Sequence, residues 1–430
     1  MSKRFLVWSH VVAIIGLASA GMALAAAPPE IWTLERSIQQ VLSVAPESQT
    51  ARAEIEARQG ALTQSGAWPN PELEVRGDNR RGKNDGTGGN ALSQLVFNQP
   101  LPLSGRLGHQ RSIAGEDLGA AQAERRYQQL LLETQTAQRF HALQLATAQL
   151  RLAEQRLQLA DDLQKTGRRR EQAGDMATLE RLRLDLIRES AQQTLAHAEG
   201  KFSEALSQFR AYAGLPAGMT PEVAALELFN PLPVLETLEA GLPQHPALLA
   251  AQHRLKASRS AVALARAERL PDPVLSLFRE RDFLNERRQN VSGIGVAVTL
   301  PLWDRNSGRI RESRAQADQA QFKIQALERD LASRLKQNHL HLSHLVEQGK
   351  HHRSRVYEPA RAVFDLTRKA YAAGELEILS LIDANNTYFD AHVRHLELLQ
   401  EAWLEAAELR LAAGKALVTT DSNTAQDAKP

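Results

Sequence analysis

Apolar side chains recur at alternating intervals of three and four residues along the stretch between residues 104 and 171. One stripe consists of Leu143, Ala146, Leu150, Ala153, Leu157 and Ala160. A second stripe, interrupted by a glutamine, consists of Leu145, Ala148, Leu152 and Leu159. The stripes are two residues apart, which places them about 200° apart around an α-helix. A helix with two apolar sides predicts a wall or ring of helices; an ordinary bundle with one wide apolar face is the alternative.

The helices that carry such stripes are unusually long. Residues 104–171 and 308–372 both have helical character, and neither stretch contains a proline before Pro359. About 65 residues at ~1.5 Å per residue give about 100 Å of helix, which no ordinary globular domain requires. Gly174 and Gly374 follow the two long stretches and indicate helix ends, and a shorter helix is expected after each glycine.

Short stretches with strand character precede each long helix. In one of them apolar residues alternate with small or polar residues, at Ile294, Val296, Val298 and Leu300. This alternation is typical of a strand with one apolar face. Paired stretches of this kind predict two β-hairpins, at residues 72–98 and 274–300, and a loop rich in glycine, asparagine and aspartate at residues 82–90 separates the strands of the first.

The same landmarks occur twice along the chain, in one order and roughly 200 residues apart. For example, Trp-Pro-Asn-Pro at residues 68–71 recurs as Leu-Pro-Asp-Pro at residues 270–273. We therefore predict two copies of one unit, a first repeat over residues 26–232 and a second repeat over residues 233–415. Each repeat consists of a helix, a β-hairpin, a long helix, a glycine turn and a further helix.

The N-terminus has the three parts of a secretory signal peptide. Two basic residues precede a mostly apolar stretch at residues 5–20, and Ala-Leu-Ala at residues 23–25 offers a cleavage site. We predict that residues 1–25 direct export and are removed. A membrane anchor is the alternative, but the apolar run is shorter than the ~20 residues that a spanning helix needs. At the other end, residues 416–430 are expected to form a disordered tail.

Composition narrows the possible functions. Of the 430 residues, 43% are apolar and only 5% are aromatic, which indicates long helices rather than a compact enzyme fold. The formal net charge is only +2, which argues against nucleic-acid binding. The chain has no cysteine, and therefore no disulfide, no thiolate metal ligand and no cysteine that could carry a lipid anchor.

Strand number bears on the oligomeric state. No stretch after the predicted signal peptide resembles a transmembrane helix, so a membrane location would require a β-barrel. Four strands per chain cannot close a spanning barrel, which has at least ~8 strands. Two or three copies would supply about 8 or about 12 strands. A closed ring of strands that continues into a ring of long helices describes a duct.

These features together resemble the TolC family of outer-membrane efflux proteins. The resemblance is carried by the duplicated layout, by Pro-Asn-Pro at residues 69–71, by Gln-Pro-Leu-Pro-Leu-Ser-Gly-Arg at residues 99–106 and by Tyr-Ala-Ala-Gly-Glu-Leu at residues 371–376, and it covers nearly all of the mature chain. It implies a mostly α fold with a small β part. It also implies a homotrimer in the outer membrane, with a 12-stranded transmembrane β-barrel that continues into a 12-helix periplasmic α-barrel.

Within this family, residues 99–105 are most similar to the cobalt–zinc–cadmium efflux branch. That branch implies an exit duct for heavy-metal cations such as cobalt, zinc or cadmium. Its implied partners are a periplasmic membrane-fusion adaptor protein and an inner-membrane pump of the resistance–nodulation–division (RND) class. Multidrug or organic-solute efflux and protein secretion are alternatives. A soluble periplasmic coiled-coil scaffold or adaptor is an alternative from a different class, but it leaves the duplicated strands unexplained.

The resemblance also assigns roles at the two glycine turns, which would be the periplasmic tips. Arg170 and Gly174 match the family's Arg-x-x-x-Gly pattern, where adaptor hairpins dock. Gly374 occupies the matching position of the second repeat, but Ala370 replaces the arginine there. One tip per chain therefore has the full docking pattern.

Gate and constriction residues are implied by the same resemblance. Tyr371 matches a gate tyrosine, and Glu180 stands where the family has a gate aspartate. Leu376 replaces the expected arginine, which puts the usual salt bridge between protomers in doubt. Asp383 matches a constriction carboxylate, and a ring of such carboxylates would favour cations. An ordinary solvated helix carboxylate is the alternative reading of Asp383.

Catalytic chemistry is not indicated. The sequence has no phosphate-binding loop with its lysine, no His-Glu-x-x-His and no nucleophile elbow, so we predict that the protein is not an enzyme and binds no cofactor. His341, His344 and His351 recur along one helical stretch and could touch a passing metal ion. A solvated helix face is the alternative for these histidines.

Overall fold

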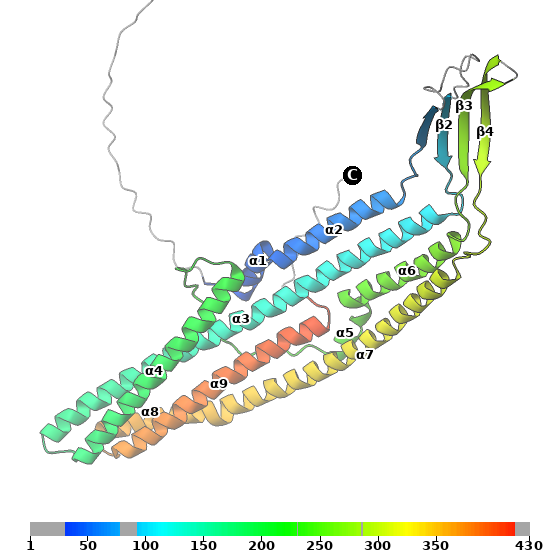
Figure 1. Cartoon of the computed structure of the whole chain (residues 1–430). Coiled ribbons are helices and arrows are strands. Elements are labelled where there is room, and N and C mark those ends of the chain that lie inside the picture. Colours follow the sequence, from blue (N-terminus) through cyan, green and yellow to red (C-terminus); the bar gives the residue numbers. More distant parts are fainter. Residues whose placement is uncertain (1–30, 78–92, 230, 285–286, 418–430) are drawn as a thin grey trace, which may run out of the picture.

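The computed structural model describes residues 31–77, 93–229, 231–284 and 287–417. The predicted signal peptide, the loop of the first hairpin and most of the C-terminal tail lie outside the described residues. In chain order the elements are α1 (Leu34–Val44), α2 (Pro46–Ser65), β1 (Glu72–Gly77), β2 (Ser93–Pro100), α3 (Arg106–Gln172), α4 (Thr178–Ala213), α5 (Leu235–Glu239), the 3₁₀-helix η1 (Leu242–Gln244), α6 (Pro246–Ala267), β3 (Val274–Leu284), β4 (Arg287–Ala297), α7 (Ser307–His352), the π-helix η2 (Arg353–Tyr357), α8 (Glu358–Ala373) and α9 (Ile378–Ala412). Figure 1 shows an elongated molecule, with the strands at one end and two helix-to-helix turns at the other.

The first helical segment of each repeat is interrupted before a proline. Ala45 and His245 have nearly identical extended conformations, φ −62° and ψ 126° against φ −61° and ψ 127°, and each precedes the proline that begins α2 or α6. A residue before proline is driven out of the helical region by the proline ring, so the single helix expected at the start of each repeat is divided at this point. The matching breaks are a structural counterpart of the duplicated sequence.

The two long helices differ in one respect that the sequence did not predict. The first, α3, runs without interruption for 67 residues. In the second, the expected continuous helix over residues 308–372 is interrupted by the π-helix η2. Pro359 lies just beyond η2 and has no N–H to continue the ladder of hydrogen bonds. The Glu358 N–H instead bonds to the carbonyl of Arg353, five residues earlier, and the helix widens by one residue.

The two apolar sides of α3 pack against different helices. On one side, Leu143 packs with Leu206 and Phe209 of α4. On the other side, Leu152 packs with Phe389 and Leu396 of α9. One long helix thus has a neighbour on each flank, which confirms the predicted wall of helices and excludes a bundle with a single apolar face.

The four strands form one antiparallel sheet in the order β1-β2-β3-β4. Within each repeat the two strands form a hairpin, and the repeats are joined through β2 and β3, whose register places Phe97 opposite Leu277. The sheet therefore belongs to both repeats, and β1 and β4 are its outer strands. The fold is mostly α-helical with a small sheet, as predicted.

Candidate functional site

One face of the sheet is apolar and exposed. A row of apolar residues crosses all four strands, because Leu73 lies opposite Phe97, Phe97 opposite Leu277 and Leu277 opposite Ile294. Leu73 and Ile294 are 64% and 73% exposed, although both are large apolar side chains. Val296 continues this face along β4. Nothing in the described part of the chain covers it, so it is a continuous surface for an apolar environment.

The opposite face of the same sheet carries most of its polar side chains, with the apolar Val96 and Phe278 among them. Gln94 on β2 donates a hydrogen bond to Glu280 on β3 at 3.3 Å, and Ser276 donates to Asn98 at 2.6 Å. Side chains of successive residues in a strand point to opposite faces, so the alternation in the sequence separates the two environments. An apolar face and a polar face on one sheet are what a channel wall in a lipid bilayer requires.

None of the described helices is long and apolar enough to cross a membrane.

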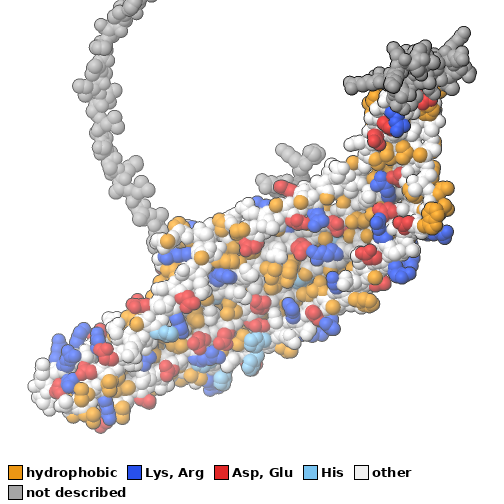
Figure 2. Space-filling model, viewed as in Figure 1, with side chains coloured by type: hydrophobic (Ala, Val, Ile, Leu, Met, Phe, Trp, Pro, Cys, Tyr) orange, Lys and Arg blue, Asp and Glu red, His pale blue; other side chains and the backbone are white. Residues whose placement is uncertain are grey.

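An ion pair stabilises the junction between the sheet and the helices. Arg106 at the start of α3 lies 2.6 Å from Asp272, which precedes β3 in the other repeat, and both side chains are largely buried. Around this junction, Trp68 and Trp303 are exposed. Figure 2 shows hydrophobic side chains gathered at this end of the molecule. The junction thus combines a partly buried charge pair between the repeats with exposed apolar side chains.

The turns at the other end have the same backbone geometry in both repeats. Gly174 and Gly374 have φ values of +83° and +79°, a left-handed conformation that glycine adopts without strain. The N–H of the following residue closes each turn on the carbonyl of Arg170 (2.8 Å) or Ala370 (2.9 Å). This bond satisfies a carbonyl at the helix end and fixes the direction of the next helix. The sequence therefore located both turns correctly.

A network of charges surrounds the first turn. Arg181 on α4 pairs with both Glu171 and Asp185, and Asp185 also lies 3.6 Å from Arg168 on α3. Figure 2 shows the Lys and Arg side chains concentrated at this end. The pairs neutralise much of that basic charge and hold α3 against α4. Sequence reasoning missed this network, because its members come from both α3 and α4 and meet only across the turn.

Tyr371, the predicted gate tyrosine, is buried between helices. It is only 7% exposed and belongs to an apolar cluster with Leu184, Phe364, Ile378 and Leu381. Its hydroxyl forms no hydrogen bond with Glu180 or with any other described residue. The guanidinium of Arg170 lies over the ring, 5.5 Å from its centroid. The structure thus brings together a predicted docking residue and a predicted gate residue.

The other predicted site residues remain apart from this cluster. Glu180 is half-buried near the start of α4, whereas Asp383 on α9 is exposed. Leu376, at the position where the family has an arginine, is also exposed. In the single chain, therefore, no described contact links the predicted constriction residue Asp383 with Tyr371.

The predicted histidine candidates do not converge. His341 lies 3.0 Å from Glu405 on α9, and His344 and His351 are exposed on α7. Among the described residues, no group of three or more histidine, aspartate or glutamate side chains is arranged to hold a metal ion. These histidines line a helix surface.

Three further histidines form a stack of rings with a tyrosine at the π-helix. His395 on α9 stacks on Tyr357 at a centroid distance of 4.9 Å and on His352 at 6.1 Å, and His392 lies 4.8 Å from Tyr357. The Nδ1 atoms of the three histidines are buried without a described hydrogen-bond partner. Burial, together with nearby positive charge, lowers the pKa of His395 to about 4. The rings fill the space between α9 and the widened helix.

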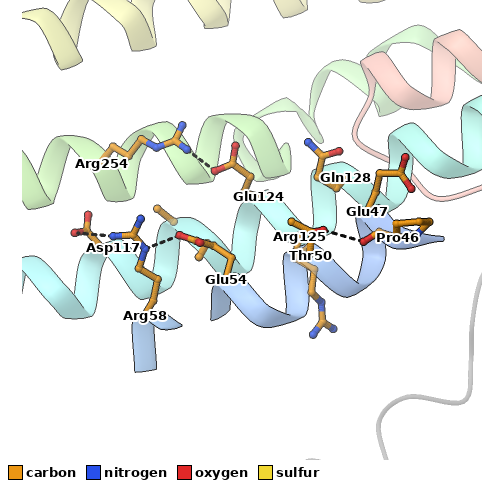
Figure 3. Close-up of a pocket in the computed structure, with 13 residues that line it drawn as sticks. Pro46, Glu47, Thr50, Glu54, Arg58, Asp117, Glu124, Arg125, Gln128 and Arg254 are labelled. Carbon is orange, nitrogen blue, oxygen red and sulfur yellow. Dashed lines mark hydrogen bonds and ion pairs between the residues drawn. The ribbon is translucent and has the colours of Figure 1, made fainter. Parts of the chain in front are cut away.

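A groove of about 540 Å³ lies where α2, α3 and α6 meet. Figure 3 shows its charged side chains in pairs. Arg58 of α2 lies 2.7 Å from Glu54 of the same helix and 3.9 Å from Asp117 of α3, and Arg254 of α6 pairs with Glu124 of α3. Because both signs of charge are paired, the groove presents no concentration of one charge to a ligand. The pair between Arg254 and Glu124 joins α6 of the second repeat to α3 of the first.

Comparison with known proteins identifies the family. The model of the outer membrane efflux protein family matches residues 37–215 and 238–415, one segment in each repeat. The cobalt-zinc-cadmium resistance protein CzcC of Cupriavidus metallidurans is 25% identical over 366 residues, which cover 85% of this chain and 86% of CzcC. The nickel-cobalt-cadmium resistance protein NccC of Alcaligenes xylosoxydans xylosoxydans is 24% identical over 328 residues, which cover 75% of this chain and 72% of NccC.

The fold is shared with solved channels. The outer-membrane channel OprN superimposes with a TM-score of 0.72 at 19% identity, over 89% of both chains. The superposition thus covers most of each chain. With the family matched in both repeats and the fold shared end to end, the chain belongs to the outer membrane efflux protein family: it is an outer-membrane efflux channel and not an enzyme.

Proposed function

We propose that this channel is the exit duct of a tripartite RND-type efflux system that exports heavy-metal cations such as cobalt, zinc or cadmium. The observation that carries the proposal is the likeness to two metal-resistance proteins, each over most of its length. The segment at residues 99–105, which leads from β2 into α3, supports the same branch of the family. The channel itself is passive, so the choice of cation belongs mainly to its partners.

The unpaired outer strands of the sheet support assembly into the homotrimer that the family resemblance implies. The outer strands β1 and β4 each have a neighbour on one side only, and strand edges in lipid must be paired. Four strands from each of three copies give a barrel of about 12 strands, a size that closes around an aqueous lumen. The apolar face described above then faces lipid and the polar face faces the lumen.

The two outer helices of the wall also support assembly into a trimer. Exposed apolar residues recur with heptad-like spacing on α4, at one edge of the wall, and along η2 and α8, at the other edge. They are Leu179, Leu182 and Leu186 on the first edge, and Val356, Val363 and Leu366 on the second. Stripes of this kind pack against a partner helix. Joining the α4 edge of one copy to the α8 edge of the next closes a 12-helix α-barrel in the periplasm.

The predicted tip roles complete the proposal. Arg170, Gly174 and Gly374 lie at the end farthest from the sheet, where a periplasmic membrane-fusion adaptor and an inner-membrane RND pump would be met. Tyr371 and Glu180 are the proposed gate residues. Asp383 is exposed on α9, and three symmetric copies would form a ring of carboxylates that favours cations.

Growth of a deletion strain tests the proposal. The strain is grown across graded cobalt, zinc, cadmium and copper, and in parallel with dyes, detergents and antibiotics. We expect selective sensitivity to metals, restored by the intact gene. Sensitivity to organic compounds alone would be consistent with an efflux duct but would contradict the proposed export of metal cations. Recovery of the protein in the soluble periplasmic fraction, rather than with the outer membrane, would reject assembly as a duct.

A further inference from the structure

The apolar face of the sheet ends in two arginines. Arg279 and Arg281 follow Leu277 on β3 at alternate positions, so their side chains project from the same face as Leu277. Figure 1 shows that β3 runs from the helical end of the molecule towards the tips of the hairpins. The face that is apolar near the helices therefore becomes basic at its far end.

The strand register shows that no acidic residue is paired with these arginines. Their directly opposite neighbours on the same face are uncharged: Leu95 and Ser292 beside Arg279, and Ser93 and Asn290 beside Arg281. Glu280, the carboxylate between the two arginines, points to the opposite face, where it accepts a hydrogen bond from Gln94. The arginines thus form a positive patch at the end of an apolar surface.

Both side chains are exposed on a strand that the assembly does not cover. Among the described residues, Arg279 makes no hydrogen bond or ion pair. Arg281 donates from Nε to the side-chain oxygen of Asn290 at 3.2 Å, which directs its guanidinium towards β4. Because β3 has β2 and β4 of the same chain as neighbours, closure of a barrel through β1 and β4 leaves both arginines accessible.

The position of the arginines matches an interface between lipid and water. An arginine on the lipid face of a barrel is strongly unfavourable at the middle of the bilayer but costs little near its surfaces. The guanidinium group binds two oxygens of one phosphate at once. Alternate residues of a strand are about 7 Å apart, so two long arginine side chains can reach the same phosphate.

We propose that Arg279 and Arg281 bind the phosphate groups of phosphorylated glycolipids in the outer leaflet of the outer membrane. The inference rests on the proposed function, which places the apolar face against lipid and the helices in the periplasm, so that the hairpin tips lie at the outer leaflet. The positive charge favours an anionic headgroup. Continuity with the apolar face favours a lipid over free phosphate, because the acyl chains pack beside the arginines.

Native mass spectrometry of the full-length, detergent-solubilised protein tests the proposal, with diphosphoryl lipid A as the probe. We expect the double variant Arg279→Gln with Arg281→Gln to bind lipid A about 10- to 30-fold more weakly than the wild type, because each basic residue near an anionic lipid surface contributes about fivefold. Lysine at both positions keeps the charge but loses the two-oxygen contact, so its affinity should be intermediate. Equal binding by the wild type and the glutamine variant would overturn the proposal.

Arg76 on β1 provides the matched control. It is exposed and pairs with Gln94, so it lies at the same depth as the two arginines but on the opposite face. Arg76→Gln should bind lipid A as the wild type does, and an equal loss in this variant would contradict a site on the lipid face.

Two measurements on the wild type depend on no substitution. High salt should weaken the binding of lipid A, and insensitivity to salt would contradict the role of the guanidinium groups. Excess inorganic phosphate should leave lipid A bound, and complete displacement would overturn the assignment to a lipid. Recovery of the protein outside the outer membrane would refute the duct and this site together, whereas normal location without arginine-dependent binding would refute the lipid site alone.

Discussion

Acid should weaken the helical wall at the ring stack of the π-helix. His395 is 9% exposed and stacks between His352 and Tyr357, and its pKa is lowered from 6.5 to about 4. Burial is the main cause of the shift. The positive charges of His352, His392 and Arg353 add to it, while Glu358 opposes it. Replacing His395 with phenylalanine keeps a ring in the stack, removes the titration and sacrifices no hydrogen bond at Nδ1.

The expected loss of unfolding free energy in acid follows from the lowered pKa of His395. Because the folded pKa lies below the unfolded value, the unfolded chain binds more protons between pH 6.5 and pH 4. The free energy of unfolding therefore falls as the pH falls through this window. At ~1.4 kcal/mol per pKa unit, His395 accounts for a loss of about 2 kcal/mol at pH 5 and about 3 kcal/mol when the loss is complete.

Thermal unfolding of the detergent-solubilised protein at pH 7.5 and pH 5 measures the effect. We expect the wild type to lose more thermal stability between these pH values than His395→Phe. His344→Phe, at an exposed position of α7, serves as the control and should show the wild-type loss. An identical loss in the wild type and in His395→Phe would show that the buried imidazole does not determine acid sensitivity.

Three further substitutions test the packing, the membrane face and the assembly. A side chain at Gly167 would overlap the buried Leu184, so Gly167→Val should cost about 1–3 kcal/mol and lower the melting temperature. Val296→Arg places a charge on the apolar face of the sheet and should cost about 2–4 kcal/mol and reduce outer-membrane insertion on fractionation, whereas Glu74→Arg on the polar face should be tolerated. Leu186→Glu charges the exposed stripe of α4 and should yield smaller species by light scattering; an unchanged mass would refute the proposed edge contact.

Much of the fold is local in origin, which is why the sequence predicts it. The stripes of α3 and the turns at Gly174 and Gly374 each depend on a few neighbouring residues. Helix periodicity and glycine or proline conformations are properties of short segments. Recognition of the duplication then extended these local predictions to the whole chain.

The remaining features depend on how distant segments are rotated against one another. The contact of Arg170 with Tyr371 joins residues of different repeats, and the sequence alone does not say which face of α3 meets α8. The pKa of His395 depends on burial by η2, whose widened turn was not predicted. Pro359 was visible in the sequence, but a proline can end, kink or widen a helix, and packing decides between these outcomes.

The pairing of β2 with β3 constrains the order in which the molecule can fold. These strands are roughly 180 residues apart, so the central pair of the sheet forms only after the whole first repeat and the start of the second, up to the end of β3, have been synthesised and exported. Until then, β2 exposes an unpaired edge and an apolar face to water, conditions that promote aggregation. Biogenesis therefore depends on protection of the first hairpin during its passage to the membrane. Because β2 pairs with a strand of the other repeat, the sheet is completed late whatever the sequence of its strands.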